Sequence, residues 1–166
     1  MSTLSPLTTL NMIVEIPKGS NIKYEWNEKC NCLTVDRVIN TPVKYFFNYG
    51  FIPNTLGPDG DPLDVVLLNS DPIYPLSHVE IKVLGMLETT DEHGQDNKIV
   101  AVLSDKIDPQ SLSINCMNDI CPYTKEQLKY FFIHYKDLDK NKWIEVSEFR
   151  DRDIALKHIA EFSLSL

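Results

Sequence analysis

Long apolar runs, internal repeats and an excess of basic residues are all missing from this sequence of 166 residues. Without an apolar run of about 18 residues, no segment predicts a membrane-spanning helix. The 16 basic residues are outnumbered by 24 acidic ones, which gives a net charge of -8. This balance argues against nucleic acid as the main partner, because binding to phosphate backbones normally needs a basic face. The 43% of hydrophobic residues suffices for one domain over residues 1–166.

Cysteine is scarce as well, and no two of the four cysteines form a C-x-x-C pair. Ordinary reduced thiols are expected, and a zinc site from C-x-C plus C-x4-C is the alternative. The first residues lack the basic start and the apolar centre of a secretory signal. We therefore expect a cytoplasmic protein. The cysteines are Cys30, Cys32, Cys116 and Cys121.

The first two thirds of the chain are typical of short strands separated by turns. Apolar and charged residues alternate with period two in some segments, and others are continuously apolar. Several short strands at this spacing predict a sandwich or a small barrel. The predicted strands are 12–17, 21–26, 33–39, 48–53, 63–68, 79–89 and 97–103.

The last third of the chain is predicted to be mainly helical. Apolar residues at helical spacing predict a helix over 122–135, with Thr124 as its N-cap. A short strand over 142–146 follows, and Ser147 is expected to cap a closing helix that ends at 162. The predicted fold is mainly β (α+β): a closed five-stranded OB-like β-barrel with two or more flanking helices, one of them C-terminal.

Three carboxylates, Asp59, Asp61 and Asp64, lie within six residues on a turn that opens an apolar strand. Gly60 and Pro62 constrain this turn, because glycine permits positive φ and proline fixes φ. Two like charges about 4 Å apart repel by about 4 kcal/mol at an effective dielectric of about 20, so the cluster needs a cation. Mg²⁺ or Mn²⁺ prefer such oxygen ligands. Taken alone, the segment is equally typical of a solvated turn.

Together with motifs elsewhere in the chain, this turn resembles the soluble family I inorganic pyrophosphatases. The segment DGDPLDV (59–65) fits that family's signature at every position, and the resemblance extends over about residues 12–146. Before NYG the chain has Phe46 and Phe47, where the family usually has proline beside the tyrosine. The further positions that carry the resemblance are Glu15, Lys23, Glu25, Arg37, Tyr49, Asp91, Asp96, Lys98, Tyr135 and Lys136.

The resemblance implies an enzyme that hydrolyses inorganic pyrophosphate to two orthophosphates at a multi-Mg²⁺ site, with Mn²⁺ or Zn²⁺ as substitute ions. A metal-activated water would be the nucleophile, and Asp61 would be the general base. Tyr49 would add a hydroxyl near that water. The implied metal ligands are Asp59, Asp64, Asp91, Asp96 and Glu15.

Substrate contacts are expected from cationic and phenolic side chains, which suit the charge of pyrophosphate. Lys98 either touches phosphate or neutralises the carboxylates, and Glu25 supports the site. The resemblance also implies a homo-oligomer, with a hexamer favoured, whereas neither nucleic acid nor a membrane is an expected partner. The expected substrate-binding residues are Lys23, Arg37, Tyr49, Tyr135, Lys136 and Lys98.

Three other functions are weighed against this one. Asp137, Asp139 and Asn141 mimic an EF-hand calcium loop, although Lys142 replaces the glycine that such a loop needs. A small β-barrel that binds single-stranded nucleic acid is the second, and the net charge opposes it. The third is an Mg²⁺-dependent phosphohydrolase that acts on a nucleotide or a polyphosphate. The four histidines share no ligand spacing and are expected to be bystanders.

Overall fold

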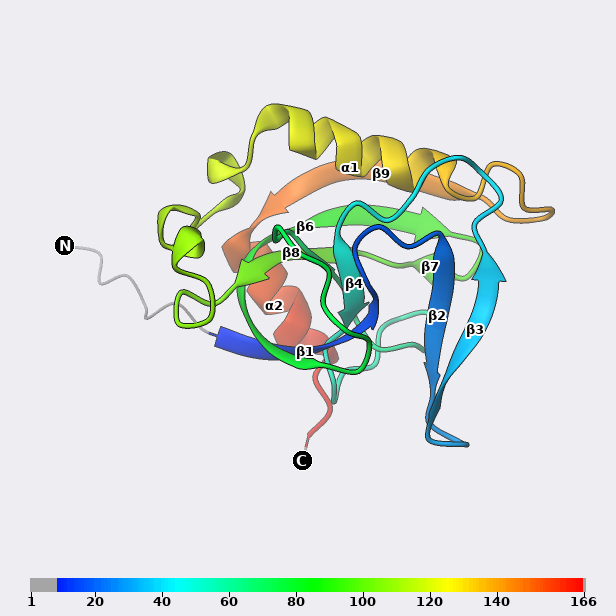
Figure 1. Ribbon diagram of the computed structural model, residues 1–166, viewed down its shortest axis with the longest axis horizontal. Helices are drawn as coiled ribbons and strands as arrows, with labels where there is room; N and C mark the ends of the chain where they lie inside the picture. The colour runs from blue at the N-terminus through cyan, green and yellow to red at the C-terminus, as the bar shows by residue number, and fades with distance from the viewer. Residues whose placement is uncertain (1–8, 166) are drawn as a thin grey trace.

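The computed structural model describes residues 9–165, so most of the N-terminal segment considered for a secretory signal lies outside the described residues. Figure 1 shows the arrangement of its elements. The strands are β1 (Thr9–Ile16), β2 (Ile22–Asn27), β3 (Cys32–Val38), β4 (Asn48–Phe51), β5 (Asp64–Leu67), β6 (His78–Asp91), β7 (Gly94–Gln95), β8 (Lys98–Leu103) and β9 (Ile144–Asp151). The helices are α1 (Pro122–His134) and α2 (Arg152–Phe162), and the short 3-10 helices are η1 (Pro109–Ser113) and η2 (Met117–Asp119).

Five strands close into a ring in the order β1-β4-β5-β8-β6, because β6 pairs back onto β1. The β5–β8 pair is parallel and the other four pairs of the ring are antiparallel. The 14-residue strand β6 extends beyond the ring and pairs there with β7 and β9. Strands β2 and β3 form a separate hairpin beside the ring (Figure 1). The predicted closed, mainly β barrel is thereby confirmed.

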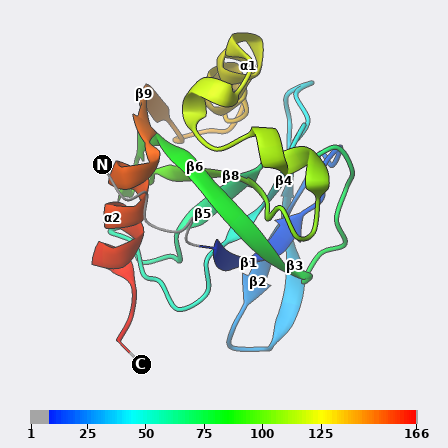
Figure 2. The same cartoon turned by 90° about the vertical axis from the view of Figure 1, so that its left-hand side faces the viewer.

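The interior of the barrel is filled by alternate residues of the ring strands, as the period-two pattern requires. Val65 and Leu67 of β5 point into this interior, whereas Val66 between them packs against α1. Helix α2 contributes Ala155 and Ile159 to the interior cluster. Figure 2 shows α1 and α2 on different sides of the sheet. Because β5 is covered on both faces, its apolar run is continuous.

The segment after α1 differs from its prediction. Strand β9 continues to Asp151, so the strand predicted to end at 146 is longer and Ser147 lies inside it. Helix α2 begins only at Arg152, and the predicted cap at Ser147 is wrong. Pairing with β6 and burial of apolar side chains outweigh the helical pattern over 148–151, because tertiary contacts override local propensity. The side chains of β9 that pack on the core are Ile144, Val146 and Phe149.

Helix α1 has the predicted extent but not the predicted cap. It begins at Pro122 with Cys121 in the N-cap position, so Thr124 lies within its first turn. Proline suits the first turn because its missing N–H would have no helical partner there. None of the helices over residues 9–165 is long and apolar enough to cross a membrane.

Residues 104–121, whose sequence pattern predicted no element, are anchored to the barrel by a buried lysine. Lys82 of β6 is 2% exposed. Its Nζ donates to Asp105 Oδ1 at 2.5 Å, to the Ser111 carbonyl at 2.6 Å and to Asn115 Oδ1 at 3.1 Å. These bonds replace the water that the ammonium loses on burial. The lysine therefore fixes η1 and its flanking turns on the sheet.

Candidate active site

The parallel pairing of β5 with β8 brings together the residues at the starts of these strands. Asp64 lies in register with Lys98. Lys98 Nζ donates to Asp64 Oδ2 at 2.8 Å and to Asp96 Oδ2 at 2.5 Å. This lysine is 1% exposed, and its ammonium lies 5.8 Å from the Tyr49 ring centroid and 5.9 Å from that of Phe132. Four expected site residues therefore meet at one place, with Phe132 beside them.

The charges of this group are not balanced. Burial raises the pKa of Asp96 to about 8, with repulsion from Asp64 and Asp59 adding to the rise and Lys98 opposing it. Burial also acts to raise the pKa of Asp64, but the charge and hydrogen bond of Lys98 outweigh it and lower that pKa. Burial acts to lower the pKa of Lys98, and the two carboxylates hold it well above its usual range. One lysine ammonium thus faces two carboxylates, and the remaining negative charge would stabilise a further cation bound here.

The turn before β5 holds the next two carboxylates beside the first. The backbone N–H of Asp61 donates to Asp59 Oδ1 at 3.1 Å. Gly60 between them has φ of 88°, a left-handed conformation that favours glycine. Burial raises the pKa of Asp61, and the negative charges of Asp59, Glu25 and Asp64 add to the rise. The Asp61 carboxylate is exposed, so a solvent molecule can reach it.

Strand β1 adds a carboxylate to this neighbourhood. Glu15 Oε2 accepts the backbone N–H of Trp26 at 2.7 Å, which joins β1 to β2. Burial raises the pKa of Glu15 to about 7, and the charges of Asp64 and Glu25 contribute to the rise. Glu25 itself is exposed on β2. The expected metal ligand Glu15 and the expected supporting residue Glu25 therefore lie at the edge of the same acidic group.

The β2–β3 hairpin carries the expected cationic pair. Lys23 and Arg37 stand opposite each other in the ladder. Asp36 Oδ2 lies 3.4 Å from Lys23 Nζ and 3.6 Å from Arg37 Nη1, and Asp139 Oδ2 lies 3.6 Å from Arg37 Nε. Neither aspartate is among the sequence-predicted site residues. The adjacency of Asp36 to Arg37 is a usable signal, whereas the contact of Asp139 requires the tertiary fold.

The end of α1 and the end of β6 form a third group. Lys136 Nζ lies 3.2 Å from Asp91 Oδ2 and 3.9 Å from Glu92 Oε2. The other oxygen of Asp91 accepts the backbone N–H of His93 at 2.9 Å. Lys136 Nζ also lies 5.5 Å from the centroid of the Tyr135 ring. Asp91 is therefore engaged by a lysine of its own rather than by Lys98.

The Phe46-Phe47 tract, where the chain departs from the family pattern, is part of an aromatic layer. Phe47 is fully buried, with its ring centroid 5.6 Å from that of Tyr45, 5.0 Å from that of Phe131 and 6.0 Å from that of Tyr49. Such edge and tilted contacts stabilise aromatic clusters. The layer fixes Tyr49 next to Lys98, and burial raises the pKa of Tyr49 well above its usual range.

The donor set fits a hard divalent cation. Carboxylate oxygens are the ligands that Mg²⁺ prefers. Burial and the neighbouring carboxylates raise the pKa of Asp61 and Asp96, and Lys98 offsets this only in part for Asp96. Within residues 9–165, no three His, Cys, Asp or Glu side chains already surround one point. Two of the carboxylates face Lys98 instead. Cation binding would therefore accompany a rearrangement of the Asp64 and Asp96 side chains.

The calcium-loop alternative does not fit the structure. The residues that would form the exit helix belong to β9. Asp137 Oδ2 lies 2.7 Å from His134 Nδ1, and Asp139 faces Arg37. The zinc alternative does not fit either. Its cysteines lie in the β2–β3 hairpin and in the segment before α1, and these two parts are on opposite sides of the molecule (Figure 1). No such cysteine group exists among the described residues.

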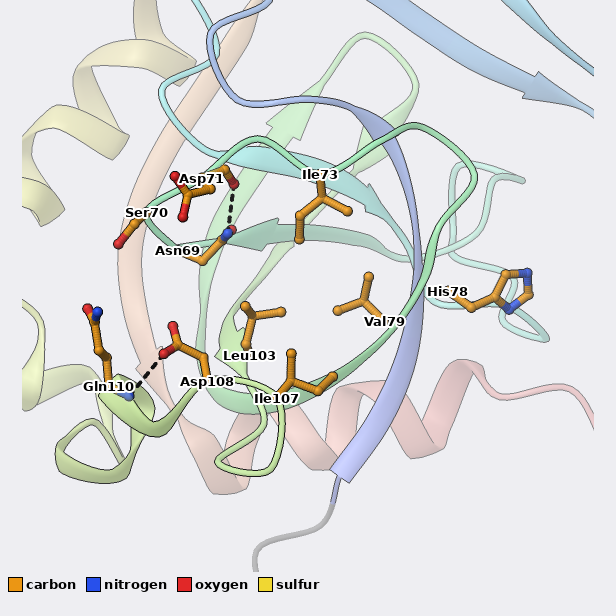
Figure 3. A pocket seen from close by; sticks show the side chains of 10 residues that line it. All are labelled: Asn69, Ser70, Asp71, Ile73, His78, Val79, Leu103, Ile107, Asp108 and Gln110. Atoms are coloured by element: carbon orange, nitrogen blue, oxygen red, sulfur yellow. Dashed lines mark hydrogen bonds between the residues drawn. The ribbon is translucent and has the colours of Figure 1, made fainter.

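A cavity of about 470 Å³ lies at the other end of β5 and β8. Figure 3 shows Ile73, Val79 and Leu103 along its wall, with His78 pointing away from it. Asp108 at its edge accepts the backbone N–H of Gln110 at 3.0 Å. This lining mixes polar and apolar residues and contains none of the expected site residues, so the cavity is not the candidate site.

The chain matches the family described as inorganic pyrophosphatase over residues 12–165. The inorganic pyrophosphatase of Sulfolobus acidocaldarius is 48% identical over 138 residues, which cover 83% of this chain and 80% of that protein. That of Thermoplasma volcanium is 46% identical over 153 residues, which cover 92% of this chain and 90% of that protein.

Solved structures agree with these relatives. The inorganic pyrophosphatase of Helicobacter pylori superposes with a TM-score of 0.91 and 38% identity, over 98% of this chain and 95% of that one. The structure of an inorganic pyrophosphatase from Coxiella burnetii gives the same TM-score with 36% identity, over 98% and 97% of the two chains. The chain therefore belongs to the soluble family I inorganic pyrophosphatases, the enzyme family that its motifs predict.

Proposed function

We propose that this chain hydrolyses inorganic pyrophosphate to two orthophosphates at the carboxylate group where β5 and β8 begin. The main support is one joint observation: a family match over residues 12–165 in a chain whose Asp64 and Asp96 both contact a buried lysine, beside the turn that carries Asp59 and Asp61. Pyrophosphate is highly anionic, and a nucleophile must approach phosphorus through anionic oxygens. Catalysis is therefore mostly charge neutralisation and positioning.

The carboxylates would hold Mg²⁺, with Mn²⁺ or Zn²⁺ as substitutes. Asp59, Asp64 and Asp96 are the principal ligands in this proposal, and Asp91 and Glu15 complete the set. When bound, such ions neutralise phosphate charge and lower the pKa of water from about 16 toward neutrality. Lys98 donates hydrogen bonds to Asp64 and Asp96, which would reorient toward a bound cation while the lysine continues to offset their charge. This contact favours the role of Lys98 as a neutralising residue over direct phosphate binding.

Asp61 is the proposed general base. It lies on the same turn as two metal ligands, and its carboxylate is exposed, so it can accept a proton from the attacking water. The hydrogen bond from its N–H to Asp59 and the left-handed Gly60 fix the turn. The hydroxyl of Tyr49, which the aromatic layer holds near Lys98, would orient the same water.

Lys23, Arg37, Tyr135 and Lys136 are the proposed phosphate-binding residues. Arginine can bind two phosphate oxygens at once, and lysine acts as a compact point charge. Their ion pairs with Asp36, Asp139 and Asp91 keep the cations in position before substrate arrives. Glu25, on the same strand as Lys23, would support this arm by orienting Lys23 and Arg37.

We also propose a cytoplasmic homo-oligomer, with a hexamer favoured. The outer surface of α1 leaves Tyr123, Tyr130 and Ile133 exposed at 66%, 59% and 43%. Aromatic and aliphatic surface of this kind is often covered by another subunit. The four free thiols suit a reducing compartment.

The test is phosphate release from pyrophosphate in millimolar Mg²⁺, with ATP and tripolyphosphate in parallel and EDTA as the control. Mg²⁺-dependent release from pyrophosphate, with slow release from the other two substrates, is the expected result. Preference for ATP or tripolyphosphate would instead indicate a related phosphohydrolase. Absence of release from all three by folded protein would contradict the proposal.

A further inference from the structure

The turn between β2 and β3 brings two thiols into contact. Cys30 Sγ and Cys32 Sγ lie 2.6 Å apart, and both side chains are exposed. In an extended strand, residues two apart are separated by about 7 Å, so an ordinary strand would keep these sulfurs apart. Asn31 between them has φ of 55°, a left-handed conformation that turns the chain back. The proximity is therefore a product of this particular turn.

The backbone of the turn is fixed by Asn27. Its side-chain oxygen accepts the N–H of Lys29 at 3.0 Å and that of Cys30 at 3.4 Å. Asn27 and Cys32 also form the last pair of the β2–β3 ladder. Lys23 and Arg37 lie at the other end of this ladder. The thiol pair is therefore preorganised, and it is separate from the proposed hydrolase site.

We propose that Cys30 and Cys32 are a reversible dithiol site that closes to an intramolecular disulfide when hydrogen peroxide oxidises it. The Cys30 thiolate attacks one peroxide oxygen, the O–O bond breaks, and sulfenic acid and water form. The Cys32 thiol then displaces the hydroxyl as a second water and forms the S–S bond. Two electrons and two protons leave the thiols, and peroxide is reduced to two waters.

Either sulfur can donate in the contact between the two thiols. Attack by Cys30 with Cys32 as the resolving thiol, and the reverse order, therefore give the same disulfide. Exposure gives peroxide access to Cys30. The two other cysteines differ in surroundings: Cys116 Sγ donates to Asp119 Oδ2 at 3.4 Å, and Cys121 lies at the N-cap of α1.

The test treats the intact protein with increasing peroxide, alkylates the remaining thiols and quantifies each cysteine by peptide mass spectrometry. Cys30 and Cys32 should lose alkylation together at doses that spare Cys116 and Cys121, with a crosslinked peptide about 2 Da lighter than the dithiol form. Dithiothreitol should restore both. In Cys30→Ser and Cys32→Ser proteins the crosslinked peptide should be absent. Equal loss of alkylation at all four cysteines would overturn the proposal, and so would oxidation of Cys30 to sulfinic or sulfonic acid without a disulfide. Either result would do so whatever the hydrolase assay gives.

An independent observation concerns Arg37, and it rests on the proposed function. The Nε of Arg37 is buried, and within residues 9–165 it has no hydrogen-bond partner. The carboxylate that faces it belongs to Asp139, whose Oδ2 lies 3.6 Å away. The other oxygen of Asp139 accepts the Asn40 side-chain N–H at 3.2 Å. One aspartate therefore ties the turn after α1 to the end of β3.

The same turn begins with a proposed phosphate-binding lysine. The backbone N–H of Asp139 donates to the Lys136 carbonyl at 2.9 Å. The backbone of Asp139 is thus hydrogen-bonded to Lys136, and its side chain faces Arg37. Both partners are proposed phosphate-binding residues. We infer that Asp139 is a positioning residue, which holds the Arg37 guanidinium at the angle needed for a phosphate oxygen and sets its place relative to Lys136.

Asp139→Asn tests this inference with Asp137→Asn as the matched control, because Asp137 lies in the same turn and faces His134. Asp139→Asn should raise the KM for pyrophosphate by roughly three- to tenfold, as for loss of a partly buried ion pair, with kcat nearly unchanged. Asp137→Asn should change neither parameter. A fall in kcat without a change in KM would refute the positioning role.

A double-mutant comparison separates positioning from a general structural effect. In an Arg37→Ala background, Asp139→Asn should cause no further rise in KM, because the group that it positions is gone. An equal rise with and without Arg37 would overturn the inference. An inactive wild-type protein would instead contradict the proposed function itself, which the same assay reports first.

Discussion

Replacing Lys98 with methionine removes the ammonium that Asp64 and Asp96 share. The lysine is 1% exposed, and its Nζ lies 2.8 Å and 2.5 Å from the two carboxylates. Breaking a buried ion pair by removing one partner typically costs about 3–5 kcal/mol. In a chain of 166 residues, this loss corresponds to a melting temperature lower by roughly 6–20 °C. We expect this full loss for Lys98→Met in EDTA.

Mg²⁺ should restore part of the lost stability. The carboxylates that the lysine leaves behind repel each other, and a divalent cation between them replaces the missing positive charge. Binding to the folded state alone stabilises it by mass action. The melting temperature of Lys98→Met should therefore rise more with Mg²⁺ than that of the wild type does. Differential scanning calorimetry in EDTA and in millimolar Mg²⁺ measures both shifts.

The chain offers a matched control in Lys82, a second almost fully buried lysine that lies outside the proposed site. It is 2% exposed and pairs with Asp105, the Ser111 carbonyl and Asn115, far from the proposed metal ligands in the sheet. Lys82→Met should lose comparable stability, and the loss should be the same in EDTA and in Mg²⁺. Equal Mg²⁺ responses of the two variants would refute the reasoning that Asp64 and Asp96 form a cation site.

Three further outcomes are expected. Asp61→Asn should slow phosphate release by roughly 10²–10⁴-fold, as for loss of a general base, while the Mg²⁺-induced rise in melting temperature persists; near-wild-type turnover would contradict the assignment. Ca²⁺ should raise the melting temperature yet support little hydrolysis, because its larger and looser coordination shell fixes a water poorly; brisk turnover in Ca²⁺ would refute this. Burial lowers the pKa of His158 below its usual 6.5, so the folded state disfavours the proton. The stability contributed by neutral His158 is present above pH 6.5 and is lost as the pH falls through the lowered pKa of the folded state. In urea unfolding, the wild type should therefore lose more stability on acidification than His158→Gln does. Identical pH profiles of the two proteins would contradict this.

The fold was largely predictable because its strands carry strong local patterns. Period-two alternation in β2 and β3, the continuous apolar run of β5 and the turn residues place these strands within about a residue of their observed ends. The end of β9 was not predictable in this way. Its last residues have a helical pattern, and only pairing with β6 makes them extended. A local pattern cannot report a partner strand that lies far away in the sequence.

The membership of the candidate site was predictable from motifs, whereas its internal pairing was not. Lys98 was expected either to touch phosphate or to neutralise carboxylates, and its contact with Asp64 depends on the parallel register of β5 and β8. Asp96 lies only two residues before Lys98, just ahead of β8, so closeness in the sequence is a signal for this contact. The contact of Asp139 had no local signal in the sequence, because its partner Arg37 belongs to a hairpin that lies far away in the chain.

We assign pyrophosphate hydrolysis to the start of β5 and not to the cavity at its other end. The most direct measurement is Mg²⁺-dependent phosphate release by the wild type beside Asp64→Asn and Asp71→Asn, because Asp71 lines that cavity. The wild type and Asp71→Asn should release phosphate at similar rates, and Asp64→Asn should be slower by orders of magnitude. Full activity of Asp64→Asn, or loss of activity in Asp71→Asn alone, would contradict this assignment.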